Sequence, residues 1–119
     1  MSTAQDGYRE RLATLLARAA PTLSVSKRVT FKSVFGAVGA YVDGSIFATC
    51  GNFGVALRLP PGELSTVFVE DGVEPLRYFP KGHVKREYAV LPERLLEDEA
   101  RIRLLMGASI AFVVDGVER

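Results

Sequence analysis

The chain has 119 residues and a formal net charge of +1, and 48% of its residues are hydrophobic against 24% charged. A chain of this length buries about two-thirds of its surface on folding, which allows one hydrophobic core but not two ordinary domains. We therefore expect one domain over residues 1–119, and the composition excludes a largely disordered chain. The single cysteine excludes an intramolecular disulfide framework, and one cysteine with one histidine cannot form a Cys/His zinc site.

The sequence contains neither a membrane-spanning pattern nor a secretory one. No apolar run approaches the roughly 20 residues that a transmembrane helix needs. The opening stretch MSTAQDGYRERL lacks the apolar core of a signal peptide. These features predict a cytoplasmic protein without a membrane partner.

The basic residues are unevenly distributed. Residues 1–35 contain six basic and two acidic side chains, whereas residues 36–80 contain two basic and five acidic ones. Proteins that bind nucleic acids gather Lys and Arg on one face, so local basic groups are candidate contacts for a nucleic acid or an acidic partner. A solvated face is the simpler explanation of the same residues. The candidate contacts are Lys27, Arg28, Lys32, Lys81, Lys85 and Arg86.

The first predicted element is a helix over residues 3–20. Ser2 or Thr3 is suited to cap its start, and residues 22–30 form a polar connector. The apolar positions repeat at the helical period and define one buried stripe. They are Tyr8, Leu12, Leu15, Leu16 and Ala19.

Three antiparallel strands are expected next, over residues 34–42, 45–50 and 53–59. Asp43-Gly44 between the first two is a strong signal for a two-residue hairpin, because both central residues of a type I′ turn need a positive φ. Gly51-Asn52 separates the second strand from the third. Gly36 and Gly39 fall inside the first expected strand, where glycine marks a bulge or a close approach of another chain.

The second half begins with a short helix over residues 61–70, closed by Asp71-Gly72. An edge strand is expected over residues 75–80 and a fifth strand over residues 83–91, with a Lys81-Gly82 turn between them. The order of elements then suits an antiparallel sheet flanked by helices.

The last predicted helix begins at Pro92 and runs to Met106, with Gly107 as its stop. The apolar tail 109–114 fits either a continued helix or a short extra strand. The predicted order is α-β-β-β-α-β-β-α. It indicates an α+β two-layer sandwich, with a sheet of about five antiparallel strands and helices packed on one face.

Three stretches share a regular punctuation by glycine, proline and aromatic residues: FGAVGAYVDGSIFA at 35–48, EDGVEPLRYFPKG at 70–82 and REYAVLPERLLED at 86–98. They resemble the N-terminal domain of the TfoX/Sxy family, the regulators of competence gene expression. The resemblance implies a stand-alone form of that domain, without the family's C-terminal domain, and a fold similar to that of type III secretion chaperones. The positions that match the family pattern, with an expected structural role, are Phe35, Gly36, Gly39, Tyr41, Asp43, Gly44, Phe47, Gly72, Pro75, Gly82, Tyr88 and Pro92.

Residues with catalytic potential are few. His83 has no nucleophile or orienting carboxylate beside it in the sequence, so we expect an exposed histidine in a turn. Cys50 ends an apolar strand and is expected as a buried small hydrophobe. The acidic runs at 70–74 and 97–99 are expected on solvated faces. We assign no catalytic residue, no cofactor and no metal site.

The aromatic residues Tyr41, Tyr78, Phe79 and Tyr88 suit stacking on bases, but they suit a sheet core or a protein interface as well. The sequence predicts a non-catalytic recognition domain that contacts a protein partner, and the resemblance implies that it is a transcriptional co-regulator or adaptor. That partner is a component of the transcription machinery or, most simply, a second copy in a homodimer. The expected docking edges are residues 75–80 and 109–114. Direct binding of nucleic acid through the basic residues is the alternative, and a small-ligand-binding protein or enzyme is a more remote one.

Overall fold

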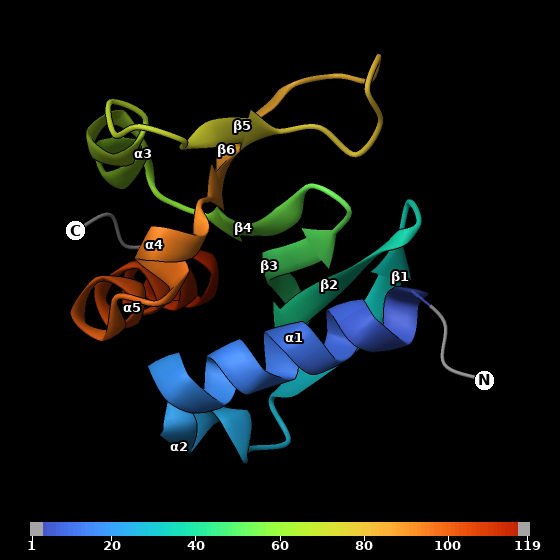
Figure 1. The fold of residues 1–119 in the computed structure, drawn as a ribbon. Helices are drawn as coiled ribbons and strands as arrows, with labels where there is room; N and C mark the ends of the chain where they lie inside the picture. Colours follow the sequence, from blue (N-terminus) through green and yellow to red (C-terminus); the bar gives the residue numbers. More distant parts are fainter. Residues whose placement is uncertain (1–3, 117–119) are drawn as a thin grey trace.

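A six-stranded antiparallel sheet with the strand order β1-β2-β3-β4-β6-β5 forms the centre of the molecule (Figure 1). The structure is a computed structural model that describes residues 4–116. Its elements are α1 (Ala4–Ala19), α2 (Pro21–Ser24), β1 (Val29–Val34), β2 (Ala37–Val42), β3 (Ser45–Gly51), β4 (Gly54–Arg58), α3 (Pro61–Val67), β5 (Glu74–Leu76), β6 (Lys85–Leu91), α4 (Glu93–Leu96) and α5 (Glu99–Asp115).

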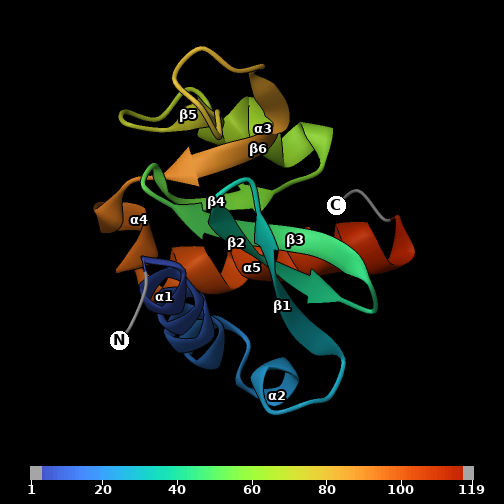
Figure 2. The same ribbon diagram turned by 90° about the vertical axis from the view of Figure 1, so that its right-hand side faces the viewer.

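The main core lies between one face of the sheet and the helices α1 and α5. Leu12 and Leu16 of α1 and Ile102 of α5 are buried against strand residues such as Phe47 and Leu57. In Figure 2 the strands β2 and β3 stand in front of α5. The prediction of an α+β sandwich with an antiparallel sheet and helices on one face is therefore confirmed.

The opposite face of the sheet, which we call the open face, has a smaller apolar cluster of its own. Ala56, Leu76 and Tyr88 form this cluster, and the side chains packed against it come from strands, turns and loops. The segment between β5 and β6, residues 77–84, folds over this face and contributes Tyr78. We call this segment the β5–β6 loop, and it lies at the end of the molecule opposite α2 in both figures (Figures 1 and 2). The β5–β6 loop explains why Ala56 of β4 is fully buried on this face.

The sheet has six strands rather than about five, because residues 29–34, almost all of which precede the expected strand 34–42, form the additional strand β1. β1 and β2 are joined by a tight turn at Phe35-Gly36, with β1 in part of the stretch expected as a polar connector. The residues before β1 also contain the short helix α2. The turn escaped prediction because it lacks the Asn-Gly or Asp-Gly pair that marks such a turn. Gly36 is consequently a turn residue and not a bulge.

The C-terminal half differs from expectation at its helix ends. The single expected helix is divided into α4 and α5, because the Asp98 carboxylate accepts a hydrogen bond from the Arg101 amide and caps a new helix. Gly107 does not stop α5, which continues through the tail 109–114. Of the two alternatives for the tail, the structure therefore shows the continued helix and not the extra strand. At the other end of the chain, Ser2 and Thr3 lie outside the described residues.

Smaller boundary changes follow the turns. The β3–β4 turn is formed by Asn52 and Phe53, one residue later than expected. The helix α3 ends at Val67, and Gly72 lies beyond it in a turn with φ +83°. The expected strands 75–80 and 83–91 are present as the shorter β5 and β6. The hairpin at Asp43-Gly44 is confirmed, with φ values of 50° and 83°.

A β-bulge in β3 is stabilised by a helix. The register pairs Tyr41 with Ile46 and Ala40 with Ala48, which leaves Phe47 without a partner on β2. The Ser109 hydroxyl of α5 donates a hydrogen bond of 2.8 Å to the Phe47 carbonyl, and both residues are buried. This bond joins the tail of α5 to the centre of the sheet.

Candidate recognition surface

Two segments that are more than forty positions apart in the sequence meet over the open face through their aromatic rings. The ring centroid of Phe35, in the β1–β2 turn, lies 5.2 Å from that of Tyr78 and 6.1 Å from that of Phe79. Tyr78 also contacts Phe53 of the β3–β4 turn, at 5.7 Å. We call Phe35, Phe53, Tyr78 and Phe79 the ring cluster. This cluster joins the β1–β2 turn and the β3–β4 turn to the β5–β6 loop.

The backbone of Phe35 has a conformation that is unusual for a bulky residue. Both central residues of the β1–β2 turn have positive φ values, 47° for Phe35 and 80° for Gly36, as a type I′ turn requires. A bulky residue is disfavoured in this region, whereas the Asp-Gly pair of the next hairpin suits it. The Phe35 side chain is nevertheless 63% exposed, so burial does not compensate for the strained conformation.

Two glycines provide space for side chains on the open face. A Cβ atom at Gly39 would lie 2.8 Å from Ile46 Cδ1 and 3.0 Å from the Tyr41 ring. A Cβ atom at Gly51 would lie 2.6 Å from the Phe53 ring. Gly39 is paired regularly with Lys32 and Thr49 and is not in a bulge, and the close contacts there are with side chains of the chain itself.

The phenols of Tyr78 and Tyr88 are neutral at physiological pH. Burial raises the pKa of Tyr88 to about 12, and the neighbouring Tyr78 adds to the shift. Burial also raises the pKa of Tyr78, partly offset by its hydrogen bond with Thr49. Tyr88 is buried and Tyr78 is half-buried, so the exposed rings of the region are Phe35 and Phe79.

The structure separates the six basic candidates into two groups, one at the β1 edge of the sheet and one at β6, which lies next to the other edge strand, β5. Lys27, Arg28 and Lys32 lie in or next to β1, whereas Lys81, Lys85 and Arg86 lie in or next to β6 and its loop. Arg28 is neutralised by Asp43, with a 2.6 Å ion pair in which the Arg28 guanidinium lowers the Asp43 pKa. The Lys32 ammonium lies 5.1 Å from the Tyr41 ring centroid, on the open face.

Sequence reasoning did not select Arg77, which belongs to the same surface. Its guanidinium donates to the Pro80 carbonyl at 3.5 Å, so it stays within the β5–β6 loop beside Phe79. It also did not select Phe35 as an exposed ring. Neither residue has a local signal for exposure, because both depend on how the turn and the loop meet.

β1 is one edge of the sheet and offers a six-residue backbone edge. The Asp43 amide donates to the Arg28 carbonyl, which makes residues 28 and 43 a hydrogen-bonded pair. Because such pairs alternate along an antiparallel ladder, the backbone groups of Val29, Phe31 and Ser33 point away from β2. The Arg9 guanidinium donates to the outward Phe31 carbonyl at 3.3 Å and lies over the Phe31 ring.

The other edge is a poor docking site. β5 is at this edge, as expected for the region 75–80, but it is only three residues long and contains Pro75. A proline has no backbone N–H to donate to an incoming strand. The second expected edge, 109–114, is part of α5. β1, which sequence reasoning did not recognise as a strand, is therefore the more accessible edge.

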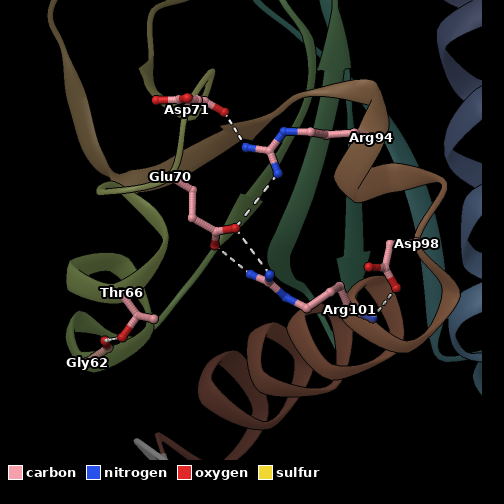
Figure 3. Close-up of polar contacts among 7 residues, drawn as sticks. All are labelled: Gly62, Thr66, Glu70, Asp71, Arg94, Asp98 and Arg101. Carbon is pink, nitrogen blue, oxygen red and sulfur yellow. Dashed lines mark hydrogen bonds and ion pairs between the residues drawn. The ribbon is translucent and has the colours of Figure 1, made fainter.

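The acidic residues after α3 join helices instead of forming a cation site. Glu70 accepts two hydrogen bonds from Arg101, at 3.1 and 2.5 Å, and lies 3.8 Å from the Arg94 guanidinium (Figure 3). The hydrogen bonds from Arg101 lower the Glu70 pKa, and both arginines add attraction. Arg94 also donates to the Asp71 carbonyl, while Asp98 caps α5. This network fixes the α3–β5 connection against the α4–α5 junction.

Side chains suited to catalysis are not assembled within residues 4–116. His83 is exposed and Cys50 is fully buried, both as predicted. Burial raises the pKa of the Cys50 thiol, which keeps it in the unreactive protonated form. A hollow of about 460 Å³ between α1 and α4 contains Arg11 and Glu93, which pair with each other. In the described part of the chain, no three His, Cys, Asp or Glu side chains are grouped to hold a metal ion.

The sequence matches the model of a known protein family. The family model of the TfoX N-terminal domain matches residues 22–113, from α2 almost to the end of α5. The chain belongs to the TfoX N-terminal domain family. The family is associated with competence regulation and is regulatory rather than enzymatic. No curated protein sequence matches the chain.

The positions of the TfoX pattern lie mainly at turns and close contacts. Tyr41 is next to the bulge, and Phe47 is buried within it. The Gly82 amide donates to the Phe79 carbonyl in the loop, and Pro92 precedes α4.

Among the helices between residues 4 and 116, none is both long and apolar enough to cross a bilayer.

Proposed function

We propose that this chain is a non-catalytic recognition domain that acts as a transcriptional adaptor or co-regulator by pairing the open edge of β1 with a partner protein. Membership in a regulatory family supports the regulatory part of this proposal. The β1 edge supports the protein contact, since outward backbone groups at Val29, Phe31 and Ser33 are donors and acceptors for an added strand.

A second copy of the chain is the simplest partner. Each copy offers the same edge, and two such edges related by a twofold axis pair antiparallel, with Phe31 at the centre. The Arg9 guanidinium must leave the Phe31 carbonyl for this to happen. A component of the transcription machinery with an exposed strand meets the same requirement, and the family association favours such a partner.

Two substitutions at Ser33 test the edge. Ser33→Pro removes the outward N–H but no ladder bond to β2, which edge strands tolerate. Ser33→Ala removes the same hydroxyl, and with it the 2.9 Å contact to Gln5, but keeps the N–H. Sedimentation over a wide concentration range should show a dimer that Ser33→Pro weakens and Ser33→Ala does not.

Retrieval from lysate extends the test to other partners. The wild type and Ser33→Ala should retrieve the same transcription protein, and Ser33→Pro should not. A chain that is monomeric at all concentrations and retrieves no such protein contradicts the proposal. So does a partner that binds the Pro and Ala variants equally well.

A further inference from the structure

Two exposed phenyl rings stand side by side at the tips of the β1–β2 turn and the β5–β6 loop. Phe35 is 63% and Phe79 55% exposed. The other exposed large hydrophobic residues between residues 4 and 116 are all aliphatic. Tyr78 contacts Phe35 and is itself held by Phe53, so the exposed rings rest on half-buried ones. Exposed apolar surface of this kind marks an interaction site.

The position of Phe35 is not explained by folding. A positive φ favours Asn, Asp or Gly, and the next hairpin has Asp43-Gly44 in the same two positions. A phenylalanine there is strained, and its exposed ring gains little from burial. Strain at an exposed position indicates a requirement other than stability, and a contact with a ligand is such a requirement.

The charged side chains nearest to these rings in the sequence are basic. Residues 27–42 contain three basic residues and residues 75–86 contain four, and neither segment contains an acidic one. The contacts of Phe35 with Tyr78 and Phe79 bring the two segments together. Of the seven cations, Arg28 is paired with Asp43, and the ion pairs formed among residues 4–116 involve none of the other six. The unpaired cations that flank the rings in sequence are Lys32, Arg77 and Lys81, whereas Lys27, Lys85 and Arg86 lie farther from the rings along the chain.

A single-stranded nucleic acid offers both chemistries that this surface matches. Its phosphates are attracted by Lys32, Arg77 and Lys81, which flank the rings in sequence. Its unpaired bases have free planar faces for Phe35 and Phe79. In a duplex the bases are stacked on each other, so only the phosphate contacts remain. An acidic peptide would use the cations but has no regular planar groups for the rings.

We propose that Phe35 and Phe79, with the flanking cations Lys32, Arg77 and Lys81, form a binding site for single-stranded nucleic acid. The site does not involve the outward backbone of β1, so it is separate from the proposed protein-docking edge. A recognition domain with both surfaces would connect a partner protein to a single-stranded nucleic acid.

Fluorescence anisotropy with a labelled oligothymidine of about 15 nucleotides tests the site, since single-strand sites commonly span about 4–16 nucleotides. Phe35→Asn removes one ring and relieves the strained turn, so this variant should fold at least as well as the wild type. Each ring variant, Phe35→Asn and Phe79→Ser, should weaken binding about fivefold or more. Val69→Ser is the control, because Val69 is 83% exposed just after α3 and lines a surface hollow with Leu104 and Leu105 of α5.

The charge contribution is tested in the same assay. Lys81→Gln should weaken binding and make the affinity less dependent on salt. The slope of log K against log salt should become shallower by about 0.7 for each phosphate that the protein no longer neutralises. Arg103→Gln removes the same charge from an exposed position on α5 and should have little effect. Ser33→Pro should leave the binding of oligothymidine unchanged, which separates this site from the β1 edge.

Three results would overturn the proposal. The first is the absence of oligothymidine binding at low salt. The second is equal affinity for the strand and its duplex, or unchanged binding by both ring variants, because the rings would then have no role. The third is binding of an acidic peptide without binding of the strand, which would make the surface a protein site.

Discussion

Removal of the Ser109 hydroxyl is the most direct test of how α5 is joined to the sheet. In Ser109→Ala, the Phe47 carbonyl at the bulge no longer accepts the 2.8 Å hydrogen bond from α5. Both residues are buried, with Ser109 0% and Phe47 1% exposed, so water does not readily replace the hydroxyl. An unsatisfied buried carbonyl costs about 1–3 kcal/mol.

A small gain offsets part of this cost. Alanine is a better helix former than serine by a few tenths of a kcal/mol, and Ser109 lies inside α5. We therefore expect the free energy of unfolding to fall by about 1–2 kcal/mol. Urea denaturation measures this as a lower midpoint with an unchanged slope.

Ser65→Ala is the control for the same chemical change at the surface. Ser65 is exposed, and its hydroxyl donates at 3.0 Å to the Pro61 carbonyl in its own helix. This variant should keep the stability of the wild type within about 0.5 kcal/mol. If Ser109→Ala is no less stable than Ser65→Ala, the bulge does not depend on the hydrogen bond from α5.

Four further predictions follow from single contacts. Gly107→Ala should raise the free energy of unfolding by about 1 kcal/mol, because Gly107 is helical and a Cβ there meets nothing within 4 Å; a decrease in stability on denaturation would contradict this. Glu70→Gln should have a lower free energy of unfolding than the wild type at neutral pH. The difference between the two proteins should shrink as the pH falls through the pKa of a free Glu and then through the lowered pKa of folded Glu70. A difference that is constant with pH would refute the Arg101 contact as its cause. Cys50 should resist a thiol reagent in the folded protein and react on unfolding, whereas rapid labelling of the folded protein would show that the thiol is accessible. Arg9→Ala should strengthen self-association in sedimentation, because Arg9 occupies the Phe31 carbonyl; weaker association would exclude edge pairing at that carbonyl.

Much of the fold follows from local patterns. The apolar period of α1, the Asp43-Gly44 hairpin and the buried strand that ends near Cys50 are each specified by a few neighbouring residues. Turns and amphipathic helices depend on short-range backbone preferences, so they are readable without knowledge of the rest of the chain.

The errors occurred where distant contacts override these preferences. Phe35-Gly36 turns without the usual turn residues, so β1 was not recognised as a strand before it. Gly107 remains helical because the residues around it pack on the sheet, with Ile102 and Met106 buried before it and Ser109 bonded to Phe47 after it. Tertiary packing outweighs the cost of about 1 kcal/mol for a glycine inside a helix.

The candidate surface depends on tertiary structure even more strongly. The sequence by itself determined the two acid-free basic segments and most of the aromatic residues near them, since these are properties of composition. Only the folded chain decided that Phe35 meets Tyr78 and Phe79, and that Asp43 neutralises Arg28. The physical reason is that the order of strands and the path of the β5–β6 loop bring these residues together, and neither is set by the residues next to them in the chain.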